Sequence, residues 1–320
     1  MHFAFLKSGV LMSLIANGLI GISLIWDKVL LRQPETRNLI NYVFWLGVIS
    51  IFGLALIPFG FHMPRAGIAV LGFGAGVLHL AAIYFYYDAL RRGEASESLA
   101  VVGGFSPVAT AVIAFFVLRQ PFAGGRLTAF VLLTAGGFLM FLAEKMEFRR
   151  MIVPVTLASA LFGLVNVMQR MVFSQTNFVS GYVFFTLGTC AGALLLLVPS
   201  AWRQQIFRQS AAANPRSRFW YFVNRFIDGV GSFLIFYAIS LTHPAIVDAI
   251  SGVRFVIIFA GALLLTKFRP QWLREDFTGR ELAIKALATA VIVAGMIWLA
   301  VHGGHEDASA ATAALRGMSF

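Results

Sequence analysis

Two ionisable side chains stand deep within apolar stretches of this 320-residue sequence. His79 lies within the segment 66–87, and Asp228 lies within the segment 219–240. Charged groups are costly in hydrocarbon, so side chains at such depth usually face protein or water and often have a function. Asp228 could accept and release a proton, and histidine is the side chain that changes charge near neutral pH. The two positions differ by 149 residues, a spacing that recurs between other parts of the chain.

Each of these two residues also has a purely structural interpretation. His79 could be a neutral, hydrogen-bonded packing residue. Asp228 could form an ion pair with Arg225, which is one helical turn away, or with Arg254. Arg254 is itself in the middle of an apolar segment and could hold an anionic group of a substrate by a forked hydrogen bond. We slightly prefer that it neutralises Asp228 or Asp248.

Further polar side chains within the apolar segments are candidates for lining a cavity. They could equally join helices by hydrogen bonds, which is a common role of polar residues in membrane helices. These candidates are Asp248, which was named above as a possible partner of Arg254, and Asn17, Asn166 and Tyr84. Lys28 and Arg170 lie near the ends of two segments at an offset of 142 and could be gate residues, although extension toward lipid headgroups is the more probable role for such side chains.

Pro107 interrupts an uncharged stretch that is long enough to cross a membrane. Proline has no amide hydrogen, so the carbonyl of Gly103 loses its helical partner. That carbonyl then needs another donor or a polar cavity, and Gly104 beside it also permits close approach of a backbone or a substrate. The stretch is either a cavity-lining helix that bends between states or a helix with a static kink, because kinked membrane helices are common.

The elements that must position these residues are membrane-spanning helices. Apolar residues form 59% of the chain and charged residues 12%, about half of the roughly 25% found in soluble domains. Uncharged runs of about 17 to 25 residues, the length that spans hydrocarbon, recur along the whole chain. Hydropathy predicts ten of them, at 8–26, 41–59, 66–87, 98–118, 126–143, 152–172, 180–199, 219–240, 245–266 and 281–301. The predicted fold class is therefore an all-α polytopic membrane protein.

The ten predicted spans form two related sets of five. YVFW (Tyr42 to Trp45) returns as YVFF (Tyr182 to Phe185), and three further matches follow in the same order. Because five is an odd number, the second set must be inverted relative to the first. We therefore predict a first five-helix repeat at 1–147, a second and inverted one at 148–301, and a flexible C-terminal tail at 302–320.

The distribution of basic residues supports this inversion and predicts an orientation. Connections after the odd-numbered spans carry 16 lysines and arginines, whereas the even side with both termini carries 5. Basic connections stay in the cytoplasm, so we expect both termini outside, in a bacterial cytoplasmic membrane. The net charge of +11 has the same origin, and no nucleic-acid-binding motif accompanies it.

Short motifs recur at matching places in both halves. The first half contains Tyr87-x-Ala89-Leu90, GEAS at 93–96, FSPV at 105–108 and the pair Gly136-Gly137. The second half contains Tyr237-Ala238-Ile239, Gly252-Val253-Arg254 and Ala294-Gly295. In their order and spacing these motifs resemble the EamA-type branch of the drug/metabolite transporter superfamily over nearly the full length.

The resemblance implies a ten-helix carrier with a central cavity between its halves, which moves small organic solutes by alternating access. Members transport amino acids, other metabolites, nucleotide-linked sugars or drugs. The chain departs from the family at Gln120, where relatives often have a glutamate after the fourth span. Many relatives are also drawn with cytoplasmic termini, in contrast to the orientation that the charges predict.

Three classes of function remain for a protein of this kind. A secondary carrier of a small organic solute, a permease or an exporter with possible proton coupling, fits the architecture best. An intramembrane enzyme needs a nucleophile and base or metal ligands at depth, but His79 is the one histidine there. A channel favours rings of like charges. We therefore expect no catalytic residue, metal or cofactor, and as partners a small-molecule substrate, protons and membrane lipids, in a monomer or homodimer.

Overall fold

The computed structural model describes residues 9–31, 38–92, 95–119, 124–142, 148–212, 214–268 and 279–317. Across these residues the chain is helical, and no strand is present. The elements are α2 (Gly9–Leu31), α3 (Leu39–Ile49), η1 (Ser50–Phe59), α4 (Ala66–Arg92), α5 (Ala95–Leu118), α6 (Gly124–Leu142), α7 (Phe148–Gln175), α8 (Phe178–Leu195), α9 (Ser200–Ala212), α10 (Pro215–Leu241), α11 (Pro244–Ala249), α12 (Gly252–Phe268) and α13 (Gly279–Gly317).

Eight helices within the described residues are long and apolar enough to cross a membrane. Two further apolar helices, Phe105–Leu118 and Leu127–Leu139, are shorter and belong to α5 and α6. Each of the ten predicted spans overlaps one of these helices. The arrangement as ten spanning helices in two inverted repeats remains a prediction.

The outer surface of the bundle is apolar. Phe52, Phe59, Phe116 and Phe226 are each more than 70% exposed, and many other large apolar side chains are also exposed. A soluble monomer rarely exposes apolar surface on this scale, whereas a membrane covers it with lipid. This surface identifies a multi-pass membrane protein.

Several helix boundaries follow from local sequence. Asn38 precedes α3, and its side chain accepts hydrogen bonds from the amides of Ile40 and Asn41. Asn177 caps α8 in the same way through the amide of Ser180. These residues satisfy amides that the first helical turn leaves without partners.

The span that contains α11 and α12 is broken after its first six residues. His243 caps α11 and is followed by proline, which is favourable at the first helical position. The α11 helix has six residues and ends at Ala249, and α12 begins at Gly252. Broken helices in membrane proteins place backbone and polar side chains next to cavities.

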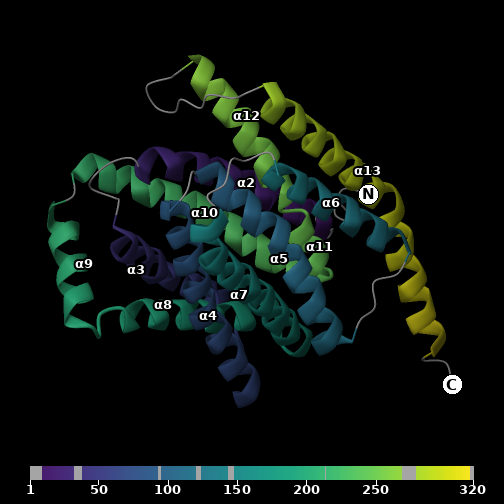
Figure 1. The fold of residues 1–320 in the computed structure, drawn as a ribbon. Coiled ribbons are helices and arrows are strands. Elements are labelled where there is room, and N and C mark those ends of the chain that lie inside the picture. Colours follow the sequence, from purple (N-terminus) through teal and green to yellow (C-terminus); the bar gives the residue numbers. More distant parts are fainter. Residues whose placement is uncertain are drawn as a thin grey trace.

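Helices from the two predicted halves pack against each other throughout the bundle. The closest packed pairs are α6 with α13, α4 with α8, α2 with α10, α4 with α7, and α5 with α7, and Figure 1 shows α13 beside α6 at the edge of the bundle. Between α4 and α8 the backbones meet at Gly76 and Gly188, where an added Cβ would overlap Phe185 and Phe73 respectively. Small residues allow this approach in membrane helices.

Two segments outside the predicted spans are helical. The connection at 200–218 contains helix α9, visible in Figure 1 as the link between α8 and α10. Helix α13 continues to Gly317, through most of the residues that we predict to form the C-terminal tail. Alanine, the best helix former, is frequent there and accounts for the helical backbone.

Candidate functional site

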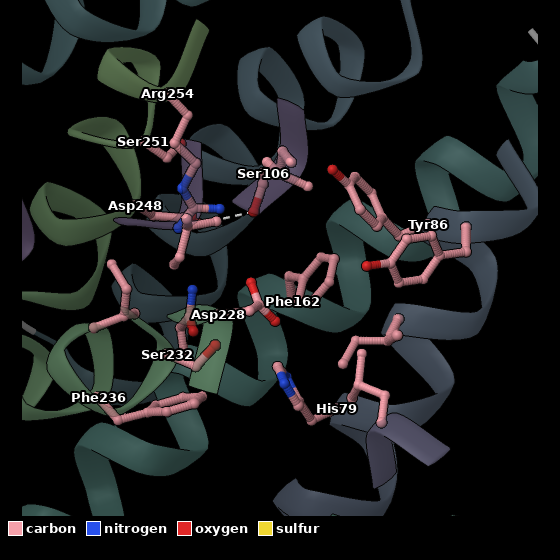
Figure 2. Close-up of a pocket in the computed structure, with 17 residues that line it drawn as sticks. His79, Tyr86, Ser106, Phe162, Asp228, Ser232, Phe236, Asp248, Ser251 and Arg254 are labelled. Carbon is pink, nitrogen blue, oxygen red and sulfur yellow. Dashed lines mark hydrogen bonds between the residues drawn. The ribbon is translucent and has the colours of Figure 1, made fainter. Parts of the chain in front are cut away.

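A cavity of about 140 Å³ lies inside the bundle and is lined by eight elements from both predicted halves. Apolar and aromatic side chains form most of its wall, and polar groups are concentrated at a few points (Figure 2). The polar and ionisable lining residues are His79, Tyr86, Tyr87, Ser106, Asn166, Asp228, Ser232, Asp248, Ser251 and Arg254. A mostly apolar wall with a small number of placed polar groups is typical of small-molecule sites.

Asp248 is held by hydroxyl groups from helix α5. Ser106 Oγ donates a hydrogen bond of 2.8 Å to its carboxylate, and Thr110 Oγ1 donates another of 2.5 Å to the same oxygen. Both donors come from the helical turn that contains Pro107. Asn166 of α7 also interacts with this carboxylate through its side chain. The proline-containing helix and the broken helix therefore meet at Asp248.

Helices α5 and α7 approach closely beside this carboxylate. A Cβ on Gly163 would lie 2.8 Å from the amide nitrogen of Thr110, so only glycine fits without displacement. The close approach brings Asn166 of α7 toward the same group that Thr110 binds.

Arg254 lies in the first turn of α12, and its side chain is beside that of Asp248 in α11. Its Nε donates a hydrogen bond to Oδ1 of Asn17, which is fully buried in α2. Asn17 in turn donates from Nδ2 to the carbonyl of Ser13 at 2.7 Å. The guanidinium is thus fixed from behind by α2 while its residue lines the cavity.

His79 lies at the aromatic side of the cavity. Its ring centroid is 5.1 Å from that of Phe185, 5.7 Å from Phe236 and 5.8 Å from Phe162. Its Nδ1 is buried and has no hydrogen-bond partner within the described residues. The structure therefore places His79 in an aromatic surround, without the hydrogen bond that the packing interpretation expected at this nitrogen.

Asp228 projects into the cavity between His79 and Arg254 (Figure 2). Its side chain is 22% exposed, and one oxygen accepts a hydrogen bond of 3.2 Å from Nη1 of Arg225. The ion pair that the sequence offered as the structural alternative is therefore present. The carboxylate nevertheless remains accessible from the cavity.

Arg225 binds Asp27 more closely than it binds Asp228. Its Nη2 lies 2.5 Å from both carboxylate oxygens of Asp27, and these two side chains are 1% and 4% exposed. Asp27 accepts further hydrogen bonds from Tyr42 at 2.5 Å, Asn224 at 2.5 Å and Tyr87 at 3.1 Å.

We call Asp27, Tyr42, Tyr87, Asn224 and Arg225 the Asp27 network. It joins helices α2, α3, α4 and α10 at one end of the cavity. The Tyr42 ring also lies 5.2 Å below the Arg225 guanidinium, a distance that permits a cation–π interaction. Buried charges need pairing and hydrogen bonding of this kind to be tolerated in the interior.

A second arginine, Arg170, joins α7 to α10 near the C-terminal end of α10, whereas Arg225 lies in the first half of α10. Nη1 of Arg170 donates to the backbone oxygens of Ile239 at 3.0 Å and Ser240 at 2.6 Å, at the C-terminal end of α10. A cation there satisfies carbonyls that the helix end leaves without partners. Arg170 therefore connects α7 to α10 and does not extend toward lipid.

The remaining sequence candidates fall in three positions. Pro107, Gly103 and Gly104 lie within the helical backbone of α5, and Lys28 lies in α2 with a side chain outside the described residues. Gln120 also falls outside them. Tyr84 is half-buried and packs against Phe85 away from the cavity, whereas Tyr86 lines it.

The sequence interpretation missed the Asp27 network apart from Arg225. Asp27 is an acid that directly follows the predicted span 8–26, and this position beside an apolar segment was the available signal. Gln169 is a further polar residue within a predicted span, and the sequence left open whether it lines a cavity or joins helices; it is fully buried on α7, and neither side-chain polar atom has a partner within the described residues.

The described residues contain no group of three histidine, cysteine, aspartate or glutamate side chains that could hold a metal ion. The polar groups of the cavity instead form hydrogen-bonded acid–base sets. Such sets can hold and orient a small polar ligand.

The helical bundle, its apolar exterior and its charged internal cavity define a multi-pass membrane protein with a polar cavity between its helices. Residues 7–142 match the family model described as the EamA-like transporter family. This match places the chain in the drug/metabolite transporter superfamily, whose EamA members are membrane transporters. No curated protein matches the chain significantly.

Solved structures support the fold alone. In total, 28 chains of solved structures match this chain. One of them, titled "Crystal structure of protein", has a TM-score of 0.60 and 17% sequence identity, and the alignment covers 93% of this chain and 96% of that chain. The similarity therefore extends across the whole helical bundle.

Proposed function

We propose that the protein is a secondary carrier that moves a small organic solute across a bacterial cytoplasmic membrane by alternating access. The observation that carries this proposal is the cavity with two carboxylates and one guanidinium placed between membrane-spanning helices. Ionisable groups at this depth are expensive and mark substrate or ion pathways. A purely structural bundle would not need an open space beside them.

The Asp27 network supplies one gate of this carrier. It joins α2, α3, α4 and α10 beside the end of the cavity that Tyr87 and Leu24 line. Opening that end requires the network to separate, and closing it restores the same hydrogen bonds. The positive-inside rule assigns this end to the cytoplasm, because the basic odd-numbered connections lie there.

Asp228 is the group that we assign to proton coupling. Its carboxylate is exposed to the cavity and has a single hydrogen bond among the described residues. A carboxylate in that position can exchange a proton with whichever side the cavity faces. A channel or an intramembrane enzyme has no comparable support, because the described cavity has neither a ring of like charges nor a metal-binding group.

A reconstituted transport assay tests the proposal. The purified chain in proteoliposomes would be screened with a panel of labelled metabolites at two pH values and with an imposed proton gradient. We expect uptake of at least one solute, and we expect Asp228→Asn to abolish its dependence on the gradient without loss of folded protein. Asp88→Asn, a buried carboxylate outside the cavity lining, is the matched control.

Two results would contradict parts of the proposal. Unchanged pH dependence in Asp228→Asn would remove its role in coupling. Solute flux that never saturates and shows no counterflow would identify a channel in place of a carrier.

A further inference from the structure

We infer that the cavity takes a substrate with a single net positive charge, and that Asp27 sets this selectivity by compensating most of the charge of Arg225, which then pairs only weakly with Asp228. This inference rests on the proposed carrier function and names the substrate class of the same site. Asp27 does not line the cavity, so it acts as a positioning residue.

The first step is the charge of the lining. The described lining contains the carboxylates of Asp228 and Asp248 and the guanidinium of Arg254, which together leave one negative charge. A charge enclosed by protein and lipid needs a partner. A monocationic solute supplies that partner, whereas a neutral or zwitterionic solute leaves the charge uncompensated.

The second step is to find the carboxylate that is available. Asp248 accepts hydrogen bonds from Ser106 and Thr110 and lies beside Arg254. Asp228 accepts one hydrogen bond of 3.2 Å, and its side chain is more exposed than those of Arg225 and Asp27. The positive group of a substrate therefore meets Asp228.

The third step explains why Arg225 compensates the charge of Asp228 only in part, although the two side chains are in contact. The guanidinium is bound at 2.5 Å to both oxygens of Asp27, and it also donates to Tyr87 at 3.2 Å. Asp27 is itself fixed by Tyr42 and Asn224. Because Asp27 compensates most of the charge of Arg225, little of that charge remains to attract the carboxylate of Asp228.

The fourth step concerns the size and body of the substrate. The cavity volume of about 140 Å³ is close to that of an engineered cavity of about 150 Å³ that holds benzene. Phe162, Phe236, His79 and Tyr86 supply aromatic wall near Asp228. Aromatic faces attract cations as well as apolar groups. An amine with an apolar body of about one ring fits both features.

Four probes with the same phenylethyl body separate the possible charges. Phenethylamine is a cation, phenylalanine a zwitterion, 3-phenylpropionate an anion and 2-phenylethanol neutral. Binding of each to the full-length chain in detergent would be measured by calorimetry. We expect phenethylamine to bind at least about 30-fold more tightly than the other three, the effect expected for one buried charge pair.

Variants then test the role of Asp27. In Asp27→Asn the charge of Arg225 is compensated by Asp228 alone, so the preference for phenethylamine over 2-phenylethanol should fall by at least about 10-fold. In Asp27→Asn with Arg225→Gln both charges are absent, and the preference should return. Tyr221→Phe, which removes a buried hydrogen bond to the carbonyl of Tyr42 without a change of charge, is the control and should keep it.

The following outcomes would overturn the inference. They are tighter binding of phenylalanine or 2-phenylethanol to the wild type, no binding of any probe, or an unchanged preference in Asp27→Asn. If Asp27→Asn does not fold, the wild-type ranking and the double variant still decide. Transport of other solutes in the metabolite screen, with no selectivity for cations, would leave the carrier function intact and reject only this inference.

Discussion

Replacement of either member of the Asp27–Arg225 pair should destabilise the protein far more than replacement of both. The pair is almost fully buried, with side chains 4% and 1% exposed. Removal of one partner from a buried ion pair costs about 3–5 kcal/mol, because it leaves a charge without compensation. Removal of both avoids that penalty.

The surrounding hydrogen bonds determine where in this range each variant should fall. In Arg225→Gln, Asp27 keeps its bonds from Tyr42, Asn224 and Tyr87, so we expect the lower end, about 3 kcal/mol. In Asp27→Asn, Arg225 keeps contacts with Asp228 and Tyr87, which gives a similar value. The double variant should lose about 2 kcal/mol or less, so the coupling between the two sites is about 4 kcal/mol.

Unfolding of the purified variants by titration with sodium dodecyl sulfate, followed by tryptophan fluorescence, measures these differences. The four free energies form a double-mutant cycle. Losses that add within about 0.5 kcal/mol would show that the two residues do not interact in the folded protein, and the gate assigned to this network would then be rejected.

Two further predictions concern packing. Gly76→Ala should destabilise the protein by about 1–3 kcal/mol, because the added Cβ would overlap the carbonyl oxygen of Phe185. Gly74→Ala is the control and should be neutral or stabilising in the same titration, because its Cβ would meet only Met168, at 3.9 Å. Equal effects of the two variants would contradict the close approach of α4 and α8. Gln169→Leu should raise stability by about 1–3 kcal/mol, because it removes two buried polar atoms that have no partner among the described residues. A loss of stability would show that these atoms are hydrogen-bonded.

The helical class and the approximate spans followed from the sequence because hydropathy is a property of single segments. Hydrocarbon thickness fixes the length of each apolar run, so ten segments could be placed without knowledge of their neighbours. The structure differs mainly where a helix continues through polar or small residues, as α13 does beyond residue 301. Alanine propensity acts there independently of the apolar pattern.

The candidate site could be predicted only in part, because contacts between helices depend on their rotation. His79, Asp228 and Arg254 were found from their depth, and the structure brings them to one cavity, where their roles remain predictions. Depth alone could not distinguish Tyr84 from Tyr86, since neighbouring positions on a helix point in different directions. It also could not reveal that Asp27, 198 residues away, binds Arg225.

The account as a whole depends on a cavity that opens alternately to the two faces of the membrane. Ser232 lines the cavity, and Cys190 is the single cysteine of the chain, so Ser232→Cys in a Cys190→Ala background offers one reporter thiol. A membrane-impermeant maleimide would be applied to each face separately, in right-side-out and inside-out vesicles.

We predict that the thiol reacts from both faces. We further predict that Arg225→Gln, which weakens the Asp27 network, raises the rate from the face of the odd-numbered connections and lowers it from the opposite face. Reaction from one face only, or a change on one face without the reciprocal change on the other, would contradict alternating access.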